Sequence, residues 1–217
     1  MNQEPDHLAE LRIRYSDTPM TSRLVPLGAK EDPIEACFER GWSDGLPVVP
    51  PTEERVLAML EGTTREASEV LGLMPSNLDT CTVEKVAINA VMAGCRPEYL
   101  PVVLTAIEAV MDKDFCLHGV LATTRFVGPV VIVNGSIAQQ IGMNCKGNAL
   151  GQGNRANATI GRAVQLAVRN IGGGKPLVEC WSTARRRCAG SSAARAAAAA
   201  TEAPEARFAH GLVVHNY

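Results

Sequence analysis

The clearest pattern of apolar and polar positions lies between residues 157 and 171. When these residues are placed 100° apart, apolar side chains gather on one side of a helix and polar side chains on the other. The apolar side holds Ile160, Ala163, Val164, Ala167, Val168 and Ile171, and the polar side holds Arg162, Gln165 and Arg169. This predicts a surface helix with one buried face. The glycines at 172–174 end it, because glycine adopts the left-handed conformation without steric cost.

Similar patterns predict earlier helices at 32–40, 52–61, 82–95 and 97–112, and a short helical turn at 65–71. Asp32 is a candidate N-cap, with a proline at the first helical position. The helix at 82–95 is apolar on most sides and should be buried. We interpret its polar stripe of Lys85, Asn89 and Arg96 as an exposed seam, and a ligand pocket is the alternative. The short break at 94–97 predicts an antiparallel helical hairpin.

The predicted secondary structure changes from helix to strand after residue 112. Residues 115–124 and 129–134 are β-like, and the continuous apolar run at 130–133 is typical of a strand covered on both faces. A turn then leads into a short helix at 137–141. Together the elements predict an α+β fold, or an irregular α/β one, with the helical hairpin packed on a small, mostly buried sheet.

Three regions of the chain differ in composition and in hydrophobic pattern. Residues 1–30 read as a polar arm, and residues 31–175 read as a single globular α+β domain. Residues 176–217 are rich in Ala and Arg without sustained apolar periodicity. We expect a weakly ordered tail there. An Ala- and Arg-rich sequence without apolar periodicity is also what translation of a GC-rich gene in the wrong reading frame would give.

Composition narrows the class of protein. The chain has 217 residues and 46 % hydrophobic content, enough for one core, and a net charge of −2 that argues against nucleic-acid binding. No apolar run is long enough to span a membrane, and the polar, acidic N-terminus is not a signal peptide. Seven cysteines without a C-x-x-C pair favour free thiols, so we expect a cytoplasmic protein. Its Ala- and Val-rich helices are also suited to packing between subunits of a homo-oligomer.

The stretch at 147–161 is the best candidate for a binding site. Gly151 and Gly153 would let a ligand approach the backbone, and the free N–H groups of a helix start attract anions. Arg155 adds a fixed positive charge, while Asn154 and Asn157 are candidate caps and ligand contacts. The glycine spacing matches neither a P-loop nor a dinucleotide fingerprint. The alternative is a tight loop whose glycines only make room for packing. No motif specifies a cofactor.

Further polar residues are candidates for catalytic or ligand-binding roles. Asp44 follows Trp42 in the stiff, proline-rich loop 41–52, as a candidate base or as part of a loop packed on the core. His118 is the natural acid–base candidate, although a lone histidine is more often structural. Cys145 lies beside a lysine and a helix start, both of which favour a thiolate, so it is a candidate nucleophile. The alternative is that it is only a small residue of the loop. Asn134, at a strand end, and Asn144 could orient a ligand.

Three stretches carry a family resemblance: 41–52 (GWSDGLPVVPPT), 83–99 (VEKVAINAVMAGCRPEY) and 153–162 (GNRANATIGR). Together they resemble a bacterial family whose members accompany, or are fused to, UGSC-type thioredoxin-like (seleno)proteins. The resemblance covers residues 31–175 and implies no particular reaction. It implies a link to thiol or selenol redox metabolism, and a different continuation after the glycines at 172–174.

Two main hypotheses follow. In the first, the chain is an enzyme that holds a small polar or anionic substrate at the loop 147–157, with His118 or Asp44 transferring protons and Cys145 as an optional nucleophile. In the second, it is a non-catalytic subunit or binding module for a thioredoxin-like or selenoprotein partner. A third and weaker hypothesis is a metal protein that uses Asp44, His118 and Cys145.

Overall fold

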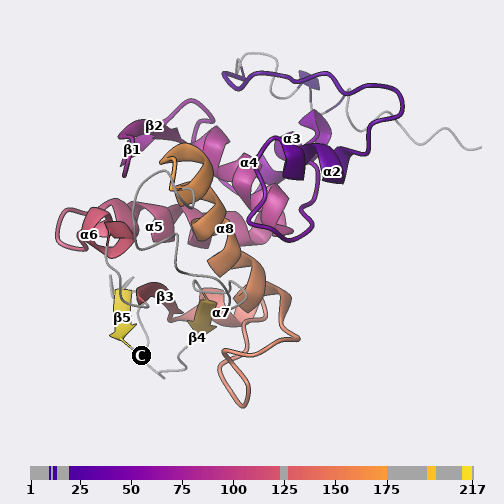
Figure 1. Cartoon of the computed structure of the whole chain (residues 1–217). Coiled ribbons are helices and arrows are strands. Elements are labelled where there is room, and N and C mark those ends of the chain that lie inside the picture. The colour runs from indigo at the N-terminus through magenta and orange to yellow at the C-terminus, as the bar shows by residue number, and fades with distance from the viewer. Residues whose placement is uncertain are drawn as a thin grey trace, which may run out of the picture.

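A computed structural model describes residues 10, 12–13, 20–122 and 127–174, and the backbone of two strands at 195–198 and 212–216. The fold is α+β (Figure 1). Its helices are α2 (Pro33–Glu39), α3 (Glu53–Leu60), α4 (Val83–Ala93), η1 (Pro97–Tyr99), α5 (Leu100–Met111), α6 (Leu117–Ala122), α7 (Ser136–Gln140) and α8 (Arg155–Ile171). Its strands are β1 (Val70–Met74), β2 (Asp79–Thr82), β3 (Val127–Val133), β4 (Arg195–Ala198) and β5 (Leu212–Asn216).

The core is built on α4 and α8, which pack more extensively on each other than on any other helix. The side chain of Thr82 caps α4 by accepting from the backbone N–H of Lys85, and Gly94 ends it at a φ of 86°. The predicted apolar side of α8 is buried, as expected. The helices predicted at 32–40, 52–61, 82–95, 97–112 and 137–141 are also confirmed, with ends shifted by one to three residues.

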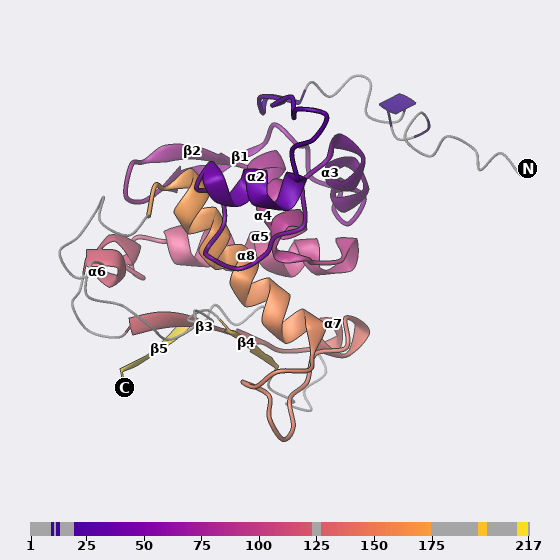
Figure 2. The ribbon, with the colours of Figure 1, turned by 45° about the vertical axis from the view of Figure 1, so that its right-hand side comes forward.

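Two small sheets lie on opposite sides of this helical layer (Figures 1 and 2). β1 and β2 form an antiparallel hairpin. β3 pairs with β4 in parallel and with β5 in antiparallel orientation. Burial along β3 is less continuous than its apolar run suggested, because only Val131 and Val133 are buried and the other positions are half-buried.

Two local predictions were wrong. Residues 115–124 were expected to be β-like, but 117–122 form helix α6, so His118 lies on a helix. Leu117, Val120 and Leu121 are spaced three and four residues apart, which puts them on one side of a helical turn facing the core. The helical turn expected at 65–71 is absent from this described stretch. Its last residues instead enter β1, because pairing with β2 outweighs local helix propensity.

Residues 20–30 arch above α2 and α3 in Figure 2 before they enter α2, and hydrogen bonds from Thr21 and Ser22 to the carboxylate of Glu84 hold them. The expected arm before residue 20 lies almost entirely outside the described residues. So does most of the predicted tail at 176–217, although β4 and β5 come from it. No helix in the described part of the chain is long and apolar enough to cross a membrane.

Candidate ligand-binding site

The loop before α8 is held together by its own asparagines. Asn157, only 2 % exposed, accepts from the backbone N–H of Asn144 at 3.0 Å. Its side-chain amide donates to the carbonyls of Asn144 at 2.8 Å and Ala149 at 2.9 Å. Asn154 accepts from the Asn157 N–H, which confirms it as the N-cap, and donates to the Gly142 carbonyl at 2.7 Å. These side chains therefore shape the loop, and their main polar groups are already used.

The remaining loop residues fit the same description. Asn144 donates to the Gly147 carbonyl and accepts from the N–H of Lys146. Gly153 has a φ of 110°, and a Cβ on Gly151 would collide with the side chain of Asn148. Two of the loop's glycines thus serve its tight path, as the packing alternative expects. Ligand binding at this loop stays a prediction.

A line of arginines on α8 fixes the proline-rich loop against the helix. Arg155, Arg162 and Arg169 are seven residues apart and so lie close to one line along α8. The Arg155 guanidinium donates to the Gly94 carbonyl at 2.9 Å, and that of Arg162 donates to the Pro47 carbonyl at 3.0 Å. Arg169 reaches the carbonyl of Gly41 at 3.5 Å. The three stretches that carry the family resemblance meet along this line.

Asp44 is held by this arrangement. Its carboxylate accepts two hydrogen bonds from Arg162, at 2.8 and 3.0 Å, and its side chain is 5 % exposed. Burial alone would raise the pKa of Asp44, but the hydrogen bonds and charge of Arg162, helped by the N–H of Leu46, lower it below its usual range. A carboxylate held this way is a weak proton acceptor. Its contacts anchor the loop 41–47 to α8.

The other candidate residues lie apart. His118 is exposed on α6, which both views place well away from α7 and the loop 142–154 (Figures 1 and 2). Cys145 is an exposed free thiol in that loop. Asn134 follows β3, and its Oδ1 is buried without a hydrogen-bond partner among the described residues. No three His, Cys, Asp or Glu side chains in the described ranges are close enough to hold a metal ion, so the structure does not bring Asp44, His118 and Cys145 together.

A cavity of about 700 Å³ lies between residues 20–27, α2, α4 and the end of α8. Its lining is mostly apolar. The contributing side chains include Met20, Leu24, Val25, Ala36, Cys37, Trp42, Ile88 and Met92. The charged groups that line it are Arg23 and Lys85 against Glu53 and Asp79, which gives no net charge. A mostly apolar cavity of this size is typical of sites for small molecules.

Two asparagines that line this cavity are hydrogen-bonded to each other. The amide nitrogen of Asn170 donates to the Trp42 carbonyl at 3.0 Å and to Oδ1 of Asn89 at 2.8 Å. The amide nitrogen of Asn89 donates to the Lys85 carbonyl at 2.8 Å. Because backbone carbonyls only accept, these bonds fix the orientation of both amides. Asn170 Oδ1 is therefore an acceptor, and it is buried without a partner in the described part of the protein.

The polar stripe on α4 thus differs from the exposed seam that we expected. Asn89 is 3 % exposed and meets α8, whereas Arg96 is exposed and Lys85 is half-buried. Sequence reasoning missed Asn170 and the cavity, and it also missed Glu84, which is fully buried on α4. A polar residue at a buried helical position was the available signal for Asn89 and Glu84. The covering segment at 20–27 offered no such signal.

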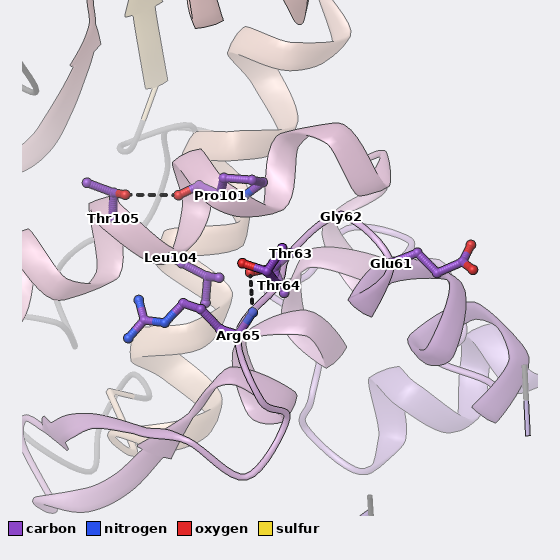
Figure 3. Close-up of a pocket in the computed structure, with 8 residues that line it drawn as sticks. All are labelled: Glu61, Gly62, Thr63, Thr64, Arg65, Pro101, Leu104 and Thr105. Carbon is purple, nitrogen blue, oxygen red and sulfur yellow. Dashed lines mark hydrogen bonds between the residues drawn. The ribbon is translucent and has the colours of Figure 1, made fainter. Parts of the chain in front are cut away.

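A second, smaller cavity of about 370 Å³ lies between the end of α3 and the start of α5 (Figure 3). The Arg65 guanidinium points away from Thr63 and Thr64 in Figure 3, and it pairs with Glu69 and Glu108, each at 2.7 Å. The hydroxyl of Thr105 donates to the Pro101 carbonyl at 3.0 Å. This cavity has no buried polar atom that lacks a partner among its described lining residues, so it offers less to a ligand.

The chain matches no protein-family model, no curated protein and no solved structure.

Proposed function

We propose that this protein binds a small, neutral molecule with an apolar body and one hydrogen-bond donor, in the cavity of about 700 Å³ beneath residues 20–27. The observation that carries the proposal is the size and mostly apolar lining of that cavity, to which Asn89 and Asn170 contribute polar side chains. A small movement of the lining would expose Oδ1 of Asn170, a buried acceptor without a partner among the described residues, to a ligand hydroxyl or N–H group. The charges along the lining cancel, which favours a neutral ligand over an anion.

This proposal favours binding over catalysis. Cys37 is the cysteine that lines the cavity, and burial raises the pKa of its thiol, which keeps it protonated and weakly nucleophilic. The acid–base roles of His118 and Asp44 and the nucleophilic role of Cys145 stay predictions, as does a thioredoxin-like or selenoprotein partner. We also infer a cytoplasmic location. The free thiols of Cys37, Cys81, Cys95, Cys116 and Cys145 support it, because cytosolic cysteines are kept reduced.

Borneol and camphor provide a matched pair of probes, because they share a compact C10 skeleton and differ in a hydroxyl against a ketone. Only borneol can donate to Asn170 Oδ1. We expect borneol to bind about twofold to tenfold more tightly than camphor, the effect of one neutral hydrogen bond. At ten times its Kd a ligand adds about 1.4 kcal/mol, which is a rise of about 3–6 °C in the thermal midpoint of a chain of this length.

Two tryptophan substitutions locate the binding. Ile88→Trp would project into the large cavity and narrow it, and Thr105→Trp would narrow the smaller one as a matched control. The borneol shift should shrink in the first variant and persist in the second. No borneol shift in the wild type, or an undiminished shift in a cooperatively melting Ile88→Trp variant, would refute the proposal.

A further inference from the structure

We infer that residues 20–27 are a strap that opens and closes the large cavity, and that the carboxylate of Glu84 is its latch. This inference rests on the proposed ligand-binding function, and it adds the route by which a ligand enters and leaves.

The strap forms one wall of the cavity but is loosely attached to the body. Of its eight residues none is buried, and Leu24 is 75 % exposed. Met20 packs against the core at the start of the strap. In the described part of the chain no backbone–backbone hydrogen bond joins residues 20–27 to the rest of the protein. Among the described residues, the strap's hydrogen bonds to the body are those of Thr21 and Ser22.

That attachment is concentrated on one carboxylate. Oε2 of Glu84 accepts from the N–H of Thr21 at 2.9 Å and from its hydroxyl at 2.8 Å, and Oε1 accepts from the N–H of Ser22 at 2.9 Å. Glu84 is 0 % exposed. Hydrogen bonds to an ionised acceptor are stronger than neutral ones, and a buried carboxylate needs them. Closing the strap therefore satisfies Glu84, and opening it leaves the carboxylate for water to solvate.

The strap can release Glu84 without disturbing the helical core. Glu84 lies in the first turn of α4, where the helix N-terminus favours a negative charge whether or not the strap is present. The strap itself contributes no buried side chain to the core. Opening thus breaks a few hydrogen bonds and exposes the cavity, while the packing of α4 on α8 is kept. Weakly packed segments of this kind open locally at a low cost in free energy.

Cys37 reports this opening without any ligand. Its thiol lines the cavity and is 3 % exposed, so N-ethylmaleimide should react with it faster when the strap opens. Cys81, 0 % exposed on β2, lines neither cavity and reports unfolding of the body. The rate at which each thiol is alkylated, measured by peptide mass spectrometry on the full chain, separates local from global opening.

Glu84→Gln keeps the size of the side chain but replaces one acceptor oxygen with an NH₂ group that faces backbone N–H donors. We expect the alkylation rate of Cys37 to rise about tenfold or more, as for weakened hydrogen bonds to a charged group, with Cys81 unchanged. Ser22→Pro removes one N–H donor from the strap without altering the body, and it should act in the same direction. Glu31→Gln is the matched control, because that half-buried carboxylate bonds to Gly28 and Arg40 and not to residues 20–27, and its effect should stay below about twofold.

Three alkylation results would overturn the inference. Cys37 alkylation could stay at the wild-type rate in both Glu84→Gln and Ser22→Pro, it could rise only in parallel with Cys81, or Glu31→Gln could match the effect of Glu84→Gln. Borneol exchange, measured by NMR line shape, should also become faster in Ser22→Pro, and an unchanged exchange rate would mean that the strap is not the gate. Absence of borneol binding would instead refute the proposed function, while the alkylation rates would still test the latch.

Discussion

Asp44→Asn is the sharpest test of what Asp44 does. The substitution keeps the shape of the side chain but leaves the Arg162 guanidinium, whose side chain is 22 % exposed, without a counter-charge. Breaking a largely buried, doubly hydrogen-bonded pair costs about 3 kcal/mol of unfolding free energy. In a chain of this length that corresponds to a fall of about 6–12 °C in the thermal midpoint.

A double-mutant cycle isolates the pair. Unfolding free energies of Asp44→Asn, Arg162→Met and the double variant can be measured by urea denaturation, followed by the fluorescence of Trp42 in a Trp181→Phe background. We expect a coupling free energy of about 2–3 kcal/mol. A coupling below about 0.5 kcal/mol would show that the ion pair does not hold the loop, and the reasoning about Asp44 would fail.

The pH dependence of the free energy of unfolding tests independently whether the pKa of Asp44 is lowered or raised. The folded-state pKa of Asp44 is lowered, so the stabilisation is present above its unfolded pKa of about 3.9 and is lost as pH falls through the folded value. The difference in unfolding free energy between wild type and Asp44→Asn should therefore be full at neutral pH and should shrink in acid below about pH 4. If the folded-state pKa of Asp44 were instead raised, wild type would lose stability relative to Asp44→Asn as pH rises above the unfolded pKa.

Other predictions concern the loop before α8 and the end of that helix. Asn157→Ala removes three hydrogen bonds within the loop and should cost about 2–4 kcal/mol, with faster limited proteolysis between residues 142 and 154 as the readout. Gly172→Ala should lower the free energy of unfolding in urea by about 1–3 kcal/mol, because its Cβ would collide with the Pro75 carbonyl oxygen. Gly147→Ala has no atom within 4 Å of the new Cβ and should change stability by less than about 0.5 kcal/mol. Arg155→Ala should leave any thermal shift by phosphate or sulfate unchanged, and a shift lost in this variant would restore the loop as an anion site.

The helices could be predicted because their signals are local. The 3.6-residue pattern of α8, the Asp32 cap and the glycines after residue 171 act within a few residues of one another. The hairpin of β1 and β2 could not be predicted in the same way. Its strands are short and have half-exposed apolar residues, and only their mutual pairing selects extended backbone.

The candidate site was harder to predict because its parts are distant in sequence. Asn154 was correctly predicted as an N-cap, and its hydrogen bonds and those of Asn157 serve the loop itself. Asn89 and Asn170 are 81 residues apart and meet only when α4 packs on α8. The strap adds a third segment, whose position depends on a carboxylate buried under it. Periodicity reveals such polar residues as anomalies and does not reveal their partners.

The most direct test of the central claim is the set of nuclear Overhauser contacts between borneol and methyl groups of the isotopically labelled protein. If the ligand enters the cavity beneath the strap, its protons should contact the methyl groups of Met20, Ile88 and Met92, and not that of Leu104 in the smaller cavity. Contacts confined to Leu104, or no contacts at millimolar borneol in the folded protein, would contradict the account.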